Sequence, residues 1–118
     1  MREFKANALT AAELRELNTF LVAFAAEPDG GGMRLEIQKS LSFDEQDRHH
    51  GLDTYCLCTE EGATYYGGVT SWTLTQNSLE IRLDACAAEA LGVEGGFVVF
   101  FAPEDLPVVQ EGLKRVFS

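Results

Sequence analysis

The residue types best suited to chemistry gather in one polar segment near the middle of the chain. Within residues 44–53, several carboxylates accompany the adjacent pair His49 and His50. Imidazoles and carboxylates together can bind zinc or transfer a proton, so a small metal-dependent enzyme is one hypothesis. The spacing matches no diagnostic metal motif, and adjacent histidines usually point in different directions, so a solvated polar loop is the stronger interpretation. We therefore predict no catalytic residue, no metal ligand and no cofactor.

The three cysteines are a second set of candidate reactive groups. Cys56 and Cys58 are two residues apart in a predicted strand and share one face, which is neither the spacing of a redox motif nor half of a zinc site. We interpret them as small core residues. Cys86 has no basic neighbour in the sequence that would activate its thiol, so we predict that it is buried beside Ala87 or Ala90.

Charge indicates the class of partner. The 118 residues carry 19 acids against 9 lysines and arginines, which argues against nucleic-acid binding because basic side chains must replace the phosphate counterions. Residues 44–61 contain six acids and one arginine, and between Arg82 and Lys114 there are six acids and no base. Such segments form either a negative face for a basic protein or a merely solvated surface.

Length and composition indicate a single domain over residues 1–118, large enough to bury a core without a disulfide or a structural metal. The cysteine count is odd, and no signal peptide is recognisable. The longest apolar run, residues 20–26, is too short to span a bilayer. These features predict a cytoplasmic protein with reduced thiols and no membrane contact.

A predicted β-hairpin over residues 65–83 is the element around which the rest must be arranged, and it carries the only tryptophan. Gly67 and Gly68 in its first strand indicate a bulge, a bend or the close approach of another backbone. A two-residue loop at positions 76 and 77 makes the face that carries Trp72 apolar, so we predict that this face is core. The predicted pairs are Leu74 with Leu79, Trp72 with Ile81 and Thr70 with Leu83.

Alternation and turn residues define the other elements. Before the hairpin, the pattern predicts strands over residues 4–9, 19–26, 33–41 and 53–58, a helical turn or loop over 10–17, and a polar loop over 42–51. After it, Asp84 is a suitable N-cap for a short helix that ends at Gly92.

Residues 97–101 are a predicted central strand, and a C-terminal helix begins at Pro103 or Pro107. This order of elements predicts an α+β fold. Its sheet is largely antiparallel, a meander of about six to seven strands, with a short helix after Leu83 and a C-terminal helix packed on the sheet.

Several of these segments form a familiar pattern together. They are the run Ser40, Leu41, Ser42, Phe43, Asp44, Glu45, Gln46 and Asp47, then Gly51, Leu52, Asp53, Thr54 and Tyr55, and then Tyr65, Tyr66, Gly67, Gly68 and Val69. Residues 79–83, Ala90, Leu91 and Gly92, and the closing run Gly112, Leu113, Lys114 and Arg115 continue it. In these segments the chain resembles the immunity protein 10 family of bacterial polymorphic toxin systems.

The resemblance implies a small cytoplasmic antidote that binds a cognate toxin protein and has no enzymatic activity. The acidic balance suits a basic nuclease toxin. A self-associating domain, in which a sheet edge or the C-terminal helix makes a homodimer, is the alternative from another class. The residues that we predict to contact the partner are Asp44, Glu45, Asp47, Arg48, His49 and Asp53.

Overall fold

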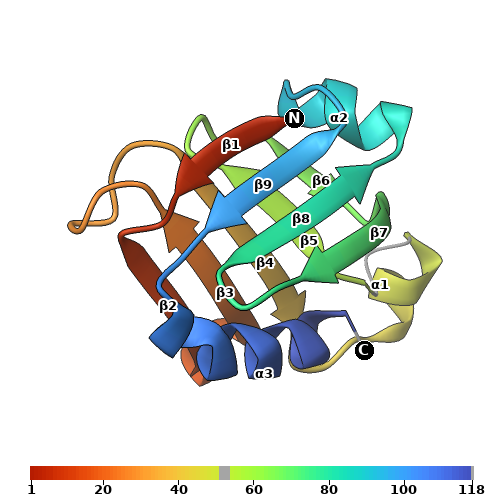
Figure 1. Cartoon of the computed structure of the whole chain (residues 1–118). Helices are drawn as coiled ribbons and strands as arrows, with labels where there is room; N and C mark the ends of the chain where they lie inside the picture. Colours follow the sequence, from red (N-terminus) through yellow and green to blue (C-terminus); the bar gives the residue numbers. More distant parts are fainter. Residues whose placement is uncertain (51–53, 118) are drawn as a thin grey trace.

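The fold is described by a computed structural model, which covers residues 1–50 and 54–117 and contains two β-sheets that face each other (Figure 1). The strands are β1 (Arg2–Lys5), β2 (Ala8–Leu14), β3 (Thr19–Ala25), β4 (Arg34–Ser40), β5 (Cys56–Thr59), β6 (Thr64–Tyr66), β7 (Val69–Leu74), β8 (Ser78–Leu83) and β9 (Gly96–Phe100). The helices are α1 (Glu45–His49), α2 (Ala85–Leu91) and α3 (Leu106–Val116), and single 3₁₀ turns lie at Arg15–Leu17 and Pro103–Asp105.

The first sheet has the strand order β1-β9-β8-β7. Strand β9 runs parallel to β1 and antiparallel to β8, and β8 runs antiparallel to β7. Residues 97–101 were expected to form a central strand, and β9 confirms this because it lies between β1 and β8. The alternation of β8 explains its place, since Leu79, Ile81 and Leu83 are buried while Arg82 between them is exposed.

The second sheet is an antiparallel meander in the order β2-β3-β4-β5-β6. Strands β3 and β4 form the predicted hairpin, with Val22 opposite Ile37 and both side chains fully buried. In Figure 1 the strands of the two sheets cross rather than run side by side. The inward faces of both sheets supply one core, in which Phe24, Phe97, Leu35 and Ile81 are among the largest fully buried side chains.

The longer helices fill opposite ends of the space between the sheets (Figure 1). Helix α2 packs on β6 and β8 and buries Ala87 and Leu91; Asp84 caps it and Gly92 ends it in the left-handed conformation, as predicted. Helix α3 packs on β2, β3 and β4 and buries Val109, Leu113 and Val116, which confirms the predicted C-terminal helix on the sheet. The α+β class is therefore confirmed.

The division into two sheets differs from a single meander, and the glycines after β6 explain it. Tyr65 and Tyr66 belong to β6 of the second sheet, and the chain crosses to the first sheet at Gly67 and Gly68, which both have positive φ values, 74° and 90°. A Cβ atom on Gly68 would lie 2.5 Å from the Cβ atom of Ala87 in α2. A bend was one of the three predictions for this pair, and it is confirmed, because the chain turns here from one sheet into the other.

The hairpin of β7 and β8 differs from its prediction in two respects. Trp72 pairs with Ile81 and Leu74 with Leu79 as expected, but Leu83 pairs with Val69 instead of Thr70, because a bulge lies between Val69 and Ser71. The side chain of Trp72 is also 40% exposed, so the prediction that it is core is wrong. Strand β7 lies at the edge of the sheet, where one neighbour is missing.

Four local predictions also differ from the structure in their bounds or element type. The first predicted strand, residues 4–9, is divided between β1 and β2, and β2 continues to Leu14 through the predicted turn or loop at 10–17. The predicted strand at 53–58 begins at Cys56 in the described residues. The polar loop at 42–51 contains α1, a one-turn helix that begins after Asp44.

Candidate functional site

Helix α1 contains most of the residues that were predicted to contact a partner, and its shape follows from two carboxylates. The Asp44 side chain accepts a hydrogen bond from the Asp47 backbone N–H at 2.7 Å, and the Asp47 side chain accepts one from the Asp44 N–H at 3.1 Å. This reciprocal capping box satisfies N–H groups that the first helical turn leaves unpaired. It leaves Glu45, Arg48 and His49 exposed, whereas Asp53 lies outside the described residues.

The histidines do not form a recognisable catalytic arrangement with these carboxylates. The rings of His49 and His50 lie edge to face with their centroids 5.3 Å apart, and both side chains are exposed. The Asp47 carboxylate is already used in the capping box. In the described part of the chain, no group of three or more histidine, cysteine or acidic side chains is placed to hold a metal ion.

The cysteines separate into one close pair and one exposed residue. The Sγ atoms of Cys56 and Cys58 lie 3.9 Å apart on one face of β5, as predicted, with Cys56 buried and Cys58 half-buried. The hydrogen bond from the Cys58 thiol lowers the pKa of Cys56 to about 7, and the same interaction raises the pKa of Cys58. Cys86 is exposed, so the prediction that it is buried is wrong. It lies on the solvent-facing side of α2, whereas the next residue, Ala87, is buried.

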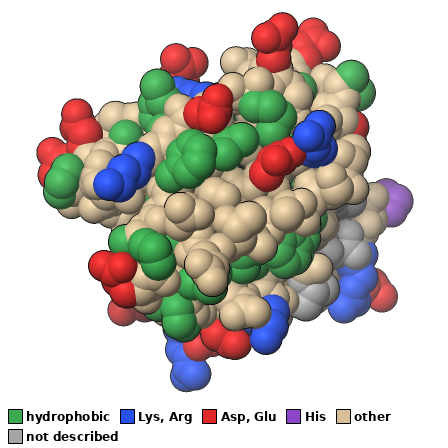
Figure 2. Space-filling view, in the orientation of Figure 1, with side chains coloured by type: hydrophobic (Ala, Val, Ile, Leu, Met, Phe, Trp, Pro, Cys, Tyr) green, Lys and Arg blue, Asp and Glu red, His purple; other side chains and the backbone are tan. Residues whose placement is uncertain are grey.

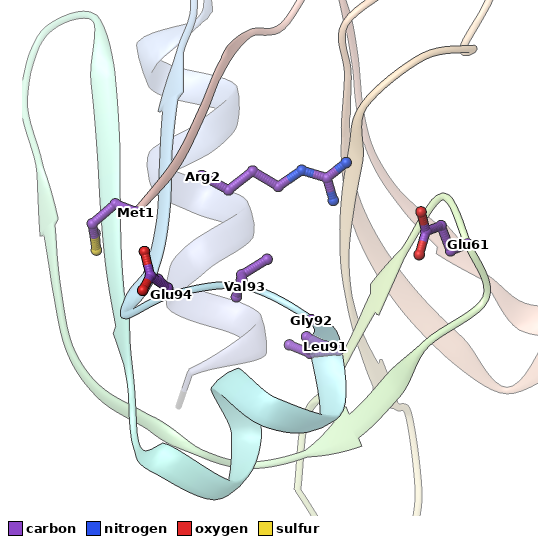
Figure 3. Close-up of a pocket in the computed structure, with 7 residues that line it drawn as sticks. All are labelled: Met1, Arg2, Glu61, Leu91, Gly92, Val93 and Glu94. Atoms are coloured by element: carbon purple, nitrogen blue, oxygen red, sulfur yellow. The ribbon is translucent and has the colours of Figure 1, made fainter.

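A hollow of about 330 Å³ lies at the α2 end of the molecule, between the start of β1 and the loop after α2 (Figure 3). Arg2 stretches across it in the close-up, and its guanidinium pairs with the Glu60 carboxylate at 2.6 Å. Burial opposes the ionised carboxylate of Glu60, but hydrogen bonds from Arg2 and from the Arg34 N–H outweigh it and lower the Glu60 pKa. Two acids of the lining, Glu61 and Glu94, are exposed to solvent.

Among the residues that the structure describes, four of the other eight lysines and arginines are also held by acids of the same chain. Four more ion pairs resemble that of Arg2, and they join Arg15 to Glu13, Arg34 to Glu36, Arg82 to Glu80, and Lys114 to Glu111. Within the described ranges, Glu61, Glu89 and Glu94 make no such pair. Figure 2 shows acidic side chains gathered along the top of the molecule, the end at which α2 lies.

Aromatic side chains anchor β7 without covering its edge. The Trp72 ring stacks on Phe117 with centroids 5.4 Å apart, and Tyr55 meets Phe117 edge to face at 5.0 Å. The Tyr55 hydroxyl accepts a hydrogen bond from the Val69 N–H at 2.9 Å. Burial raises the Tyr55 pKa, the Val69 N–H lowers it, and the Asp84 carboxylate raises it further. Sequence reasoning missed this arrangement because Trp72 looked like a core residue.

One comparison decides the family. The model of a protein family described as Immunity protein 10 matches residues 5–106, which is most of the chain. The chain belongs to the immunity protein 10 family. The matched residues include every segment that carries the resemblance except the closing run at 112–115. No curated protein and no solved structure matches the chain.

Membership of the immunity protein 10 family supports a role in toxin immunity and suggests a non-catalytic, inhibitory function. None of the helices in residues 1–50 and 54–117 is long and apolar enough to cross a membrane. Two of the residues shared with the pattern of the immunity protein 10 family have structural tasks here. Asp44 caps α1, and the absence of a side chain at Gly68 allows Ala87 of α2 to pack close to the start of β7.

Proposed function

We propose that this chain neutralises a cognate bacterial toxin by binding its toxin domain in the cytoplasm of the cell that makes both proteins. The observation that carries this proposal is the match of the immunity protein 10 family over residues 5–106. The net charge of -10 supports a toxin with a basic surface, such as a nuclease, because opposite charges accelerate the encounter.

We propose that α1 forms one part of the interface. Its exposed residues Glu45, Arg48 and His49 project from a short helix whose capping box fixes the backbone. Asp44 and Asp47 add negative charge at its first turn, where carboxylates are also favoured by the helix dipole. A helix held in this way presents its charges without a large loss of conformational entropy when the toxin binds.

Co-expression tests the proposal. The protein encoded by the neighbouring reading frame is produced in a bacterial host with and without this chain, and growth and co-purification are measured. The proposal expects growth arrest without the chain, growth with it, and a complex that purifies as one species. A neighbour that is harmless alone, or that never co-purifies, would contradict it.

Charge reversal tests α1 separately from the overall function. Glu45 is exposed and takes no part in the capping box, so Glu45→Lys should leave the fold intact and slow association at low salt by roughly tenfold. The matched control is Glu27→Lys in the turn between β3 and β4, which lies on the opposite side of the molecule in Figure 1. Equal association rates for the two variants would remove α1 from the interface.

One observation favours self-association as a second candidate. Phe100 is 40% exposed on β9, and Figure 2 shows hydrophobic side chains gathered over the middle of the front sheet. A homodimer through this face would bury them. Sedimentation of the free chain tests this, because a monomer over the micromolar range would exclude a stable dimer.

A further inference from the structure

The four edge strands of the two sheets are not equally protected against pairing with another strand. Strand β1 carries Arg2, Glu3 and Lys5, and charges of this kind discourage pairing with a further strand. Strand β6 has three residues and packs against α2, and β2 packs against α3. Strand β7 has six residues, Val-Thr-Ser-Trp-Thr-Leu, with no charge and no proline. It is the edge most open to another strand.

The hydrogen-bond register identifies which backbone groups of β7 are free. Leu83 donates its N–H to Gly95 and Phe101 donates to Asn77, so the odd-numbered residues of β8 point their backbone groups toward β9. The even-numbered residues therefore point toward β7, where Glu80 pairs with Thr73 and Arg82 with Ser71.

The residues between these pairs face the other way. The N–H and C=O groups of Trp72 and Leu74 are directed away from β8, and within the described residues neither N–H donates to another part of the chain. The bulge between Val69 and Ser71 limits the free stretch to residues 71–74. This stretch is a short template of alternating donors and acceptors.

We propose that β7 is extended by a β-strand of the toxin, which adds to the first sheet beside Trp72 and Leu74. This inference rests on the proposed function and names the mode of recognition within it. Main-chain hydrogen bonds to an exposed strand provide affinity, and alternate side chains provide specificity.

Charge argues for a toxin strand over a second copy of this chain. Acids lie near the start of the free edge: Asp84 donates its N–H to Gly68, just before β7, and Asp47 of α1 is close enough to Tyr66 to help raise the pKa of Tyr66, after burial and the two β5 cysteines. A strand that carries lysine or arginine complements these acids. A second copy would bring another net charge of -10 against them.

The strand would not be the whole interface. A stable complex buries about 800 Å² on each partner, which is more than four paired residues supply. Helices α1 and α2 flank the crossing into β7 and would contribute the remaining contact area. An uncharged strand between two acidic helices therefore combines backbone pairing with electrostatic complementarity.

Residue-resolved amide hydrogen exchange tests the proposal directly. The probe is the product of the neighbouring reading frame with its active site inactivated, added to the full chain. We expect the N–H groups of Trp72 and Leu74 to exchange at least about tenfold more slowly in the complex. The N–H groups of Ser71 and Thr73 are already bonded to β8 and should change far less. The complex could form and protect a host from the toxin while the amide exchange rates of Trp72 and Leu74 stay unchanged. That result would overturn strand addition and leave the proposed function intact.

Substitution of an exposed side chain gives an independent test. Thr73→Lys places a charge on the edge beside the incoming strand and should weaken binding by about tenfold or more, whereas the uncharged Thr73→Val should bind as the wild type does. Equal binding of the two variants would contradict the proposal. Slow amide exchange of Trp72 and Leu74 in the free chain, together with a dimeric sedimentation profile, would show that a second copy pairs with this edge. That result would also contradict the proposal. Absence of any complex would reject the proposed function as well.

Discussion

Strand β8 lies between two other strands, whereas β7, its partner in the same hairpin, lies at the edge of the sheet. In β8, Leu79 and Ile81 are fully buried, but in β7 the paired Trp72 is 40% exposed. The two strands have similar apolar patterns, so pattern alone does not separate a strand that holds the fold from one that offers a surface. The number of neighbours separates them, and it depends on the rest of the chain.

The largest expected effect compares the core side of this hairpin with its edge. Ile81→Ala removes a fully buried side chain and should lower the free energy of unfolding by about 2–5 kcal/mol. Trp72→Ala removes a half-exposed ring and its stack on Phe117, and should cost about 1–2 kcal/mol. Urea denaturation measures both. A greater loss for Trp72→Ala would show that β7 is part of the core after all.

The crossing into β7 gives the next effect. Gly68 has a φ of 90° and no room for a Cβ atom beside Ala87, so Gly68→Ala should destabilise the chain by about 2–4 kcal/mol. Gly62→Ala is the matched control, because its φ is 81° but nothing lies within 4 Å of the added atom; it should cost about 1 kcal/mol. If the two variants unfold at the same urea concentration, contact with α2 does not hold the start of β7.

The two helices that flank this crossing should respond differently to loss of their caps. Helix α2 buries Ala87 and Leu91, so Asp84→Ala should cost about 1 kcal/mol of global stability. Helix α1 has no buried residue, so Asp44→Ala should leave the unfolding midpoint nearly unchanged and accelerate amide exchange within α1 only. A large global loss for Asp44→Ala would mean that α1 is anchored more firmly than its exposure indicates.

The smallest expected effect is a difference in how stability depends on pH between the two edge strands of the first sheet, β1 and β7. The Glu60 pKa is lowered in the fold, so its ion pair with Arg2 of β1 stabilises the protein above the unfolded pKa of about 4.3 and is lost as pH falls through the folded value. The stability difference between wild type and Glu60→Gln should therefore shrink in acid. The stack of Trp72 on Phe117 contains no group that titrates in acid, so the stability difference caused by Trp72→Phe should not change over the same acidic range. A pH-independent difference for Glu60→Gln would contradict the role of this pair.

The distribution of apolar residues predicted β3, β4, β8 and β9 well, because each of these strands has two neighbours and places several apolar side chains in the core. It failed where neighbours were missing or side chains were small. The alanines of β2 give a weak pattern, which explains why residues 10–14 of this strand are predicted as part of a turn or loop. For α1, the carboxylates three residues apart at Asp44 and Asp47 were a readable capping signal that the expectation of a polar loop overlooked.

The role of the polar segment in partner contact stays a prediction. What the structure adds is that Asp44 and Asp47 cap α1. The free edge of β7 could not be read from the sequence. Its uncharged run of Val69, Thr70, Ser71, Trp72, Thr73 and Leu74 fits an inner strand equally well, and only the strand order places it at an edge.

Titration of the toxin's activity with the purified chain tests the central claim most directly. The protein encoded by the neighbouring reading frame, which the proposed function identifies as the toxin, is assayed for activity while the chain is added in known molar ratios. Neutralisation by tight binding predicts that toxin activity falls linearly and reaches zero at a fixed molar ratio of chain to toxin. Full toxin activity in the presence of a large molar excess of the folded chain would contradict the account.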